Sequence, residues 1–235
     1  MTPGVDLPPS SEPVPGFEAE AAPPVIPGRF RRAMVRTLDD AMPEEWVREL
    51  GRWLYYHRHA LARGGDSAGV ERYNFELFEV DKRAPELAAP LRAKILSEIP
   101  NALAPCCVPD FDVRYVEMTA TLHHHGGHFV WHDDAPGYDG EIVPSRRLSW
   151  TYYVHTSPKM FRGGELEFLD GTAVEPRCNR LTMFHPVQMH RVRPVECWSA
   201  ELLHGRWALM GWIHGDPPPG WVERIPKLRD RPASG

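Results

Sequence analysis

The sequence predicts a mainly β fold of the α+β class, in which a jelly-roll-like β domain follows a helical region. From about Phe111 onward, short runs rich in β-branched and aromatic residues are separated by Gly, Pro and Asp, which is the pattern of β-sandwiches and jelly rolls. Before Phe111, apolar residues recur at helical spacing in two segments. A chain of 235 residues with 42% hydrophobic residues is long enough for one domain with a buried core.

Proline marks the ends of the folded unit. Eight of the 25 prolines lie in residues 1–28, and five lie in residues 216–235. Segments this rich in proline and this poor in core-forming residues stay extended, so we predict a flexible arm over 1–28 and a tail over 216–235. Between them we expect a helical support region with one added strand over 29–110, followed by the β-rich core over 111–215.

The support region contains two predicted helices and a strand. Pro43 suits the first position of a helix, and the two glutamates that follow it suit the positive end of the helix dipole. Its apolar residues have helical spacing: Trp46, Val47, Leu50, Trp53, Leu54 and Leu61. Pro85 opens a second helix, and Pro100 is expected to end it. The apolar face of this helix is predicted to be Leu87, Leu91, Ile95 and Leu96. The run 72–80 between the helices has the composition of a strand.

A His-X-Asp pair lies near the start of the β region. If residues 129–134 are extended, side chains alternate between faces, so His132 and Asp134 project together while Asp133 points away. One imidazole and one carboxylate then share a face. His190, from a later strand, would complete a set of two histidines and one carboxylate, which holds a metal and leaves positions open, as in non-haem Fe(II) oxygenases.

Two other metal-ligand assignments compete with this set. His185 lies five residues before His190 and is a rival third ligand, but it lacks the valine and proline that follow His190. His128 and His132 are four residues apart, a spacing that on a helix would suggest a zinc pair. The glycines before His128 and the β-type run after it oppose a helix at this point.

Further motifs follow the His-X-Asp pair in a fixed order. They are a strand over 146–154, Gly163-Gly164-Glu165-Leu166, a strand over 180–184, an HxVxPV segment within 189–195, and an arginine that begins an aromatic strand over 206–214. In this order, over roughly residues 112–215, the chain closely resembles the prolyl-4-hydroxylase-like group of Fe(II)/2-oxoglutarate dioxygenases. The resemblance implies that 111–215 is a catalytic double-stranded β-helix of the jelly-roll or cupin-like type, with the N-terminal helices buttressing one face.

The resemblance also implies a set of cofactors and their ligands. Fe(II) would be held by His132, Asp134 and His190, with 2-oxoglutarate and O2 as cosubstrates and ascorbate as a stimulant. Arg206 is expected to bind the C5 carboxylate of 2-oxoglutarate through two parallel charge-assisted hydrogen bonds, with Tyr153 donating its hydroxyl to the same carboxylate.

Two departures from the family pattern affect the cosubstrate site. The family's cation follows the distal histidine more closely, whereas sixteen residues separate His190 from Arg206, with an apparent insertion over 196–205. Arg193 is therefore the alternative cation. Many relatives also carry a tyrosine about ten residues before the first ligand, near the C1 carboxylate of 2-oxoglutarate, where this chain has histidines at 123–125. We expect one of them, with His123 as the first choice, to replace the tyrosine as a hydrogen-bond donor.

The implied reaction is hydroxylation of an unactivated C–H bond, with succinate and CO2 as coproducts. Asp134 occupies the position where related halogenases have a small residue that makes room for chloride, which favours hydroxylation. A prolyl residue or a proline-like amino acid is the expected substrate, and a small-molecule natural-product intermediate is the alternative. The pocket mouth is expected in loops 135–145, 123–125 and 72–76. A non-catalytic domain that binds a metal or ligand is the hypothesis from a different class.

Charge and cysteine content limit the other possibilities. A net charge of −5 and a pI near 6.2 do not indicate the excess of positive charge that is typical of nucleic-acid-binding proteins. The longest apolar runs are too short to span a membrane. The four cysteines have no CxxC spacing, and the first residues lack the pattern of a signal peptide. We therefore expect a cytoplasmic monomer or homodimer whose partner is a small-molecule or peptide substrate.

Overall fold

The computed structural model describes residues 33–63, 74–134 and 146–216. The predicted arm over 1–28, the tail after Asp216, the mouth loop 135–145 and residues 72–73 lie outside the described residues. No helix within the described ranges is long and apolar enough to cross a membrane.

Helices are few, and most of them come before the β-rich part of the chain. The α-helices are α1 (Glu44–Tyr56), α2 (Val80–Arg83) and α3 (Pro85–Leu103), and the 3-10 helices are η1 (Arg58–Ala60) and η2 (Leu202–His204). The strands are β1 (Val35–Leu38), β2 (Ala62–Arg63), β3 (Phe75–Leu77), β4 (Val113–Val116), β5 (Thr119–His123), β6 (Phe129–His132), β7 (Arg146–Val154), β8 (Phe161–Gly163), β9 (Leu166–Phe168), β10 (Ala173–Val174), β11 (Arg180–Phe184), β12 (His190–Val192), β13 (Val195–Cys197) and β14 (Arg206–Gly215).

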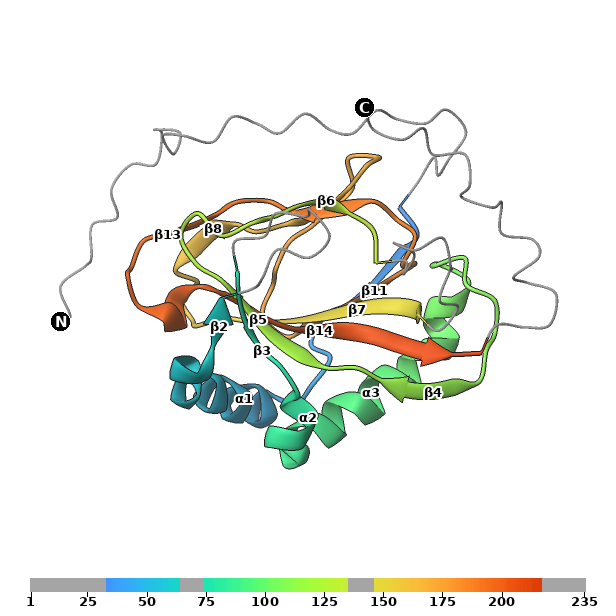
Figure 1. Ribbon diagram of the computed structural model, residues 1–235, viewed down its shortest axis with the longest axis horizontal. Coiled ribbons are helices and arrows are strands. Elements are labelled where there is room, and N and C mark those ends of the chain that lie inside the picture. The colour runs from blue at the N-terminus through green and yellow to red at the C-terminus, as the bar shows by residue number, and fades with distance from the viewer. Residues whose placement is uncertain (1–32, 64–73, 135–145, 217–235) are drawn as a thin grey trace.

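The strands form one large and two small antiparallel sheets. The large sheet has the order β1-β11-β7-β14-β5-β3-β2, with β4 also paired to β14. The smaller sheets are β10-β9-β12-β6 and β13-β8. In Figure 1 the helices cover one face of the large sheet and the strands of the small sheets lie across its other face. This arrangement is a double-stranded β-helix buttressed by helices, which confirms the predicted fold class.

Alternation along the strands divides the large sheet into an outer and an inner face. On β7, Leu148, Trp150 and Tyr152 belong to the main hydrophobic core, which also contains buried residues of α1 and α3. Tyr153 belongs instead to a second cluster, with Leu166, Phe168, Val174, Phe184 and Ala208. The helices therefore pack against the outer face and stabilise it. The inner face, which lies between the sheets, is the face on which a functional site can form.

The second predicted helix begins as expected but does not end at Pro100. Pro85 occupies the first turn of α3, and the helix continues through Pro100 to Leu103. Proline removes one backbone hydrogen bond, but Pro100 lies in the last turn, where burial of Ile99 and Ala102 offsets that loss. Leu96 was predicted to lie on the buried face, and this is wrong, because its side chain is 38% exposed.

The boundaries of the other N-terminal elements also differ from the prediction. Pro43 is the N-cap of α1 and not its first helical residue, and Leu61 follows the helix. The strand predicted over 72–80 is reduced to β3, and Val80 already begins α2. Strand β1 was not predicted. It pairs with β11, so its place in the sheet depends on a partner far along the chain, which local composition does not reveal.

Candidate metal centre and cosubstrate site

Two histidines and one aspartate meet between the sheets. His132 is the last residue of β6 and His190 the first of β12, and these strands pair with the two histidines opposite each other. Asp134 follows two residues after His132. The His132 Nε2 atom lies 3.9 Å from Asp134 Oδ1, and the His190 Nε2 atom lies 3.7 Å from Asp134 Oδ2. The three potential ligand atoms lie within 4.8 Å of one another, and no other such group of three occurs among the residues that the structure describes.

Both imidazoles are turned so that their Nε2 lone pairs face the aspartate. The Nδ1 atom of His132 lies 2.8 Å from the carbonyl oxygen of Val130, and the Nδ1 atom of His190 lies 2.8 Å from that of Gln188. A carbonyl only accepts, so each Nδ1 carries the proton and each Nε2 is left as a donor of an electron pair. This donor set, two imidazole nitrogens and one carboxylate, fits Fe(II).

The carboxylate of Asp134 is buried and anchored. It is 6% exposed, and the Ser149 hydroxyl donates to its Oδ2 atom at 2.6 Å. Burial opposes the charged form, but His190 and His132, when protonated, and the Ser149 hydroxyl together hold the pKa of Asp134 below its ordinary value. The site therefore presents an ionised carboxylate, as a metal ligand requires.

The two competing metal assignments do not share this geometry. His185 lies between β11 and β12, where its Nδ1 atom accepts from the backbone N–H of Val187, and burial lowers its pKa to about 4. It is not part of the cluster. His128 precedes strand β6 and is not on a helix, so the zinc-pair spacing has no helical basis.

Strand β6 ends at His132, yet the side chain of Asp134 still lies on the same side of the chain as that of His132, as predicted.

Arg206 begins β14 and is buried deep between the sheets. It is 3% exposed, and its Nε atom donates to the carbonyl oxygen of Gly164 at 2.7 Å. Burial lowers the pKa of Arg206, with Tyr153 acting in the opposite direction, but a guanidinium stays charged in proteins. Gly164 makes this contact possible, because a Cβ atom there would lie 2.6 Å from Arg206 Cδ and the backbone φ is +72°. The second glycine of the double-glycine motif thus leaves room for the side chain of Arg206.

Two polar side chains beside Arg206 have an unused polar atom. The Tyr153 hydroxyl and the His123 Nε2 atom are buried and have no hydrogen-bond partner among the described residues. The Arg206 Nη1 atom donates to His123 Nδ1 at 3.4 Å, so the neutral ring carries its proton on Nε2. Burial, and then the charge of Arg206, hold the pKa of His123 well below its ordinary value. Burial raises the pKa of Tyr153, so its hydroxyl stays protonated.

Arg193, the alternative cation, lies in a different environment. Its side chain is 43% exposed and its guanidinium pairs with Glu167 at 2.6 Å. A carboxylate there would compete with water and with Glu167. The burial of Arg206 and its two unpartnered neighbours favour Arg206. The apparent insertion over 196–205 includes the last two residues of β13 and all of η2, so the additional residues are accommodated in folded elements before β14.

Two residues near the cluster were not identified from the sequence. Ser149 contacts Asp134, as described above. Trp212 lies under Arg146, whose guanidinium carbon is 3.5 Å from the centroid of the Trp212 ring and whose Nη1 atom donates to the Asp134 carbonyl at 3.0 Å. Strand parity offered a signal for Ser149, because it shares a face with Tyr153. Trp212 could be found only once its pairing with Ser149 across β14 and β7 was known.

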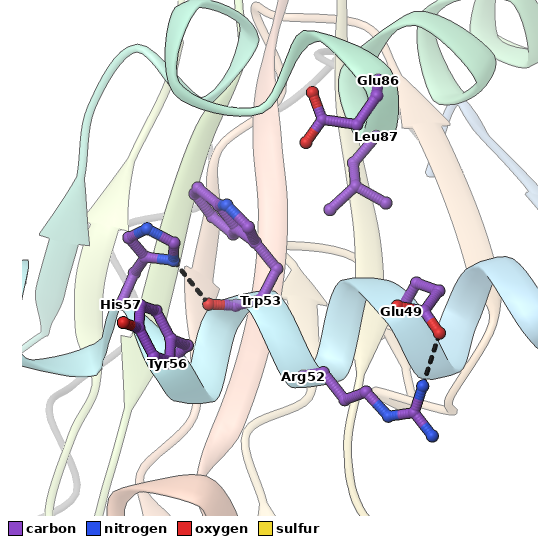
Figure 2. A pocket seen from close by; sticks show the side chains of 7 residues that line it. All are labelled: Glu49, Arg52, Trp53, Tyr56, His57, Glu86 and Leu87. Carbon is purple, nitrogen blue, oxygen red and sulfur yellow. Dashed lines mark hydrogen bonds and ion pairs between the residues drawn. The ribbon is translucent and has the colours of Figure 1, made fainter.

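A separate groove lies on the helical side of the molecule. It has a volume of about 480 Å³ and is lined by residues of α1, of α3 and by His57. Figure 2 shows Trp53 and Leu87 facing this space, with the Glu49–Arg52 ion pair at one side. None of the residues that line it belongs to the histidine and aspartate cluster, so the groove is separate from the candidate metal centre.

Sequence comparison finds one matching family model and one curated relative. Residues 117–214 match the family model of the 2OG-Fe(II) oxygenase superfamily. An uncharacterized PKHD-type hydroxylase of Synechocystis sp. is 30% identical over 159 residues, which are 62% of this chain and 51% of that relative. The chain thus spans about half the length of this curated relative.

Solved structures share the fold. A prolyl hydroxylase from Trichoplax adhaerens, in complex with a fragment of a hypoxia-inducible factor, aligns with a TM-score of 0.58 and 16% identity, covering 78% of this chain and 84% of that one. A Pseudomonas putida prolyl-4-hydroxylase aligns with a TM-score of 0.56 and 20% identity, covering 78% and 94%. Residues 117–214 thus match the 2OG-Fe(II) oxygenase superfamily, and the described part of the chain has the fold of these prolyl hydroxylases.

Proposed function

We propose that this chain is an Fe(II)- and 2-oxoglutarate-dependent hydroxylase, with His132, Asp134 and His190 as the iron ligands. One observation carries the proposal. Two imidazoles, each with Nδ1 held by a backbone carbonyl, direct Nε2 toward the same buried carboxylate. Three ligands on one side of a metal leave the other side for a chelating cosubstrate and O2.

Arg206 is proposed to hold the C5 carboxylate of 2-oxoglutarate. Among the described residues no carboxylate pairs with this buried guanidinium, so an anionic ligand would supply its missing partner. Its neighbours suit the same ligand, since the Tyr153 hydroxyl and the His123 Nε2–H are both donors with unused capacity. The site therefore offers three donors to the C5 carboxylate, and His123, which was expected near the C1 carboxylate, is proposed to lie at the C5 end instead because it contacts Arg206.

The bound iron supplies the capacity to couple oxidative decarboxylation of 2-oxoglutarate to oxidation of a C–H bond. The protein's own side chains bind and orient. His132 and His190 are held by the carbonyls behind them, Ser149 orients Asp134, and Arg206 positions the cosubstrate. The presence of a carboxylate at position 134 supports hydroxylation as the outcome, because this ligand position is not left open for a halide.

The proposed substrate is a prolyl residue in a peptide, or a proline-like amino acid. The Synechocystis relative is named as a PKHD-type hydroxylase and the two solved structures described above as prolyl hydroxylases, which supports this choice. Arg146 and Trp212 border the candidate metal centre and provide guanidinium N–H donors beside an aromatic ring. Guanidinium donors suit the carbonyl or carboxylate oxygens of a peptide or amino acid.

Turnover with a substrate panel tests the proposed function. The chain is incubated with Fe(II), 2-oxoglutarate, ascorbate and O2, together with proline-containing peptides, the same peptides with alanine in place of proline, free proline or a set of small metabolites. We expect succinate to form in step with a product that has gained one oxygen atom, for a proline compound and not for its alanine counterpart. An oxygenated metabolite in place of a proline compound would contradict the substrate class, and no succinate from any mixture would contradict the hydroxylase itself.

A further inference from the structure

Within the described part of the chain, Ser149 donates the one hydrogen bond that the carboxylate of Asp134 accepts. Its Oγ atom lies 2.6 Å from Asp134 Oδ2, and Ser149 itself is only 1% exposed. An ionised carboxylate has no proton to donate, so the hydroxyl of Ser149 must be the donor. A donor to a charged acceptor in a buried site makes a strong hydrogen bond, which holds the carboxylate in one orientation.

The position of Ser149 follows from strand parity. Leu148 and Trp150 pack into the core beneath the helices, so Ser149 between them projects to the inner face. There it lies between Phe184 of β11 and Trp212 of β14, its partners in the two neighbouring strands. These large neighbours leave the serine little freedom. The rigid centre of the large sheet thus holds Asp134, which lies after the end of β6.

The two carboxylate oxygens of Asp134 differ as a result. Oδ2 accepts the hydrogen bond from Ser149, whereas Oδ1 accepts no hydrogen bond from any described residue. Oδ1 therefore keeps both of its lone pairs for a ligand. A carboxylate whose second oxygen is occupied in this way is disposed to bind a metal through one oxygen and not two.

We propose that Ser149 is a positioning residue, which holds Asp134 as a one-oxygen metal ligand and so keeps a coordination position open. This inference rests on the proposed function, because it assumes that the triad holds a metal. Hydrogen-bond partners behind metal ligands contribute about 10–100-fold to metal affinity. Ser149→Ala is therefore expected to weaken metal binding by about this factor, and Ser149→Thr, which keeps the hydroxyl, to restore affinity to within about threefold of the parent.

Mn(II) is the probe, because it does not oxidise in air and its free form is quantified by electron paramagnetic resonance. The metal-free parent and the variants are titrated below their melting temperatures. Thr182→Val is the matched control, because Thr182 is fully buried on a neighbouring strand and its hydroxyl has no hydrogen-bond partner among the described residues. Its affinity for Mn(II) is expected to stay within about threefold of the parent, since no supporting hydrogen bond is lost.

The outcomes separate the role of Ser149 from that of the triad. A parent chain that binds no Mn(II) would contradict the metal centre, and with it the proposed function. A parent that binds Mn(II) no more tightly than Ser149→Ala would overturn only the role of Ser149. The same conclusion would follow from equal losses in Ser149→Ala and Ser149→Thr, or in Ser149→Ala and Thr182→Val, because the hydroxyl would then not be the cause.

Discussion

Replacing Arg206 by methionine is expected to raise the dissociation constant for 2-oxoglutarate by about 100-fold or more. Arg206 is 3% exposed, and removing one member of a buried, hydrogen-bonded charge pair costs about 2–5 kcal/mol. The melting temperature of the protein without cosubstrate is expected to stay equal or to rise, because methionine fills the space and leaves no buried charge without a carboxylate. Calorimetric titration of the Mn(II)-loaded protein measures the first quantity, and thermal unfolding measures the second.

Arg193→Met is the matched control for this substitution. The side chain is the same, but Arg193 is 43% exposed and paired with Glu167, so the dissociation constant for 2-oxoglutarate should change by less than about threefold. A large loss of affinity in Arg193→Met, with none in Arg206→Met, would reverse the assignment of the cosubstrate cation.

Replacing Gly163 by alanine is expected to destabilise the fold by about 3–5 kcal/mol, a large part of a typical domain's stability. A Cβ atom at this position would lie 2.1 Å from the carbonyl oxygen of Pro194, and the backbone φ is +74°. Neither the backbone oxygen nor the paired strands β8 and β13 can move aside cheaply. Urea unfolding of the parent and the variant measures the difference in the free energy of unfolding.

Gly171→Ala separates the two causes of that loss. Gly171 also has a positive φ, +86°, but a Cβ atom there would meet nothing within 4 Å. Its cost should therefore be the backbone strain alone, about 1–2 kcal/mol. Equal losses at the two glycines would show that the close approach to Pro194 contributes nothing to stability.

The inner face of the β domain could be predicted from the sequence because alternation is a local property. His132 and Asp134 share a face through their spacing, and the strand over 146–154 was identified correctly from its composition. His190 was paired with them by its motif, and the structure places it opposite His132 in the ladder. These predictions required only the period of a strand and the order of the segments.

Contacts between distant strands could not be predicted in the same way. The unused Nε2–H of His123 depends on its pairing opposite Arg206, and the place of Trp212 depends on the register of β14 against β7. The sixteen-residue separation between His190 and Arg206 made Arg206 an uncertain choice of cosubstrate cation from the sequence. Its burial and its hydrogen bond to the carbonyl oxygen of Gly164 are tertiary features. The passage of α3 through Pro100 has the same origin, because packing outweighs a local helix-ending signal.

The central claim is that His132, Asp134 and His190 hold Fe(II) where 2-oxoglutarate can chelate it. Anaerobic addition of Fe(II) and 2-oxoglutarate tests this claim most directly, because chelation by the keto acid produces a visible metal-to-ligand charge-transfer band. We expect the band in the parent and in His185→Ala, which removes the rival histidine, and its loss in His190→Ala. Absence of the band from the parent, or its persistence in His190→Ala, would contradict the account.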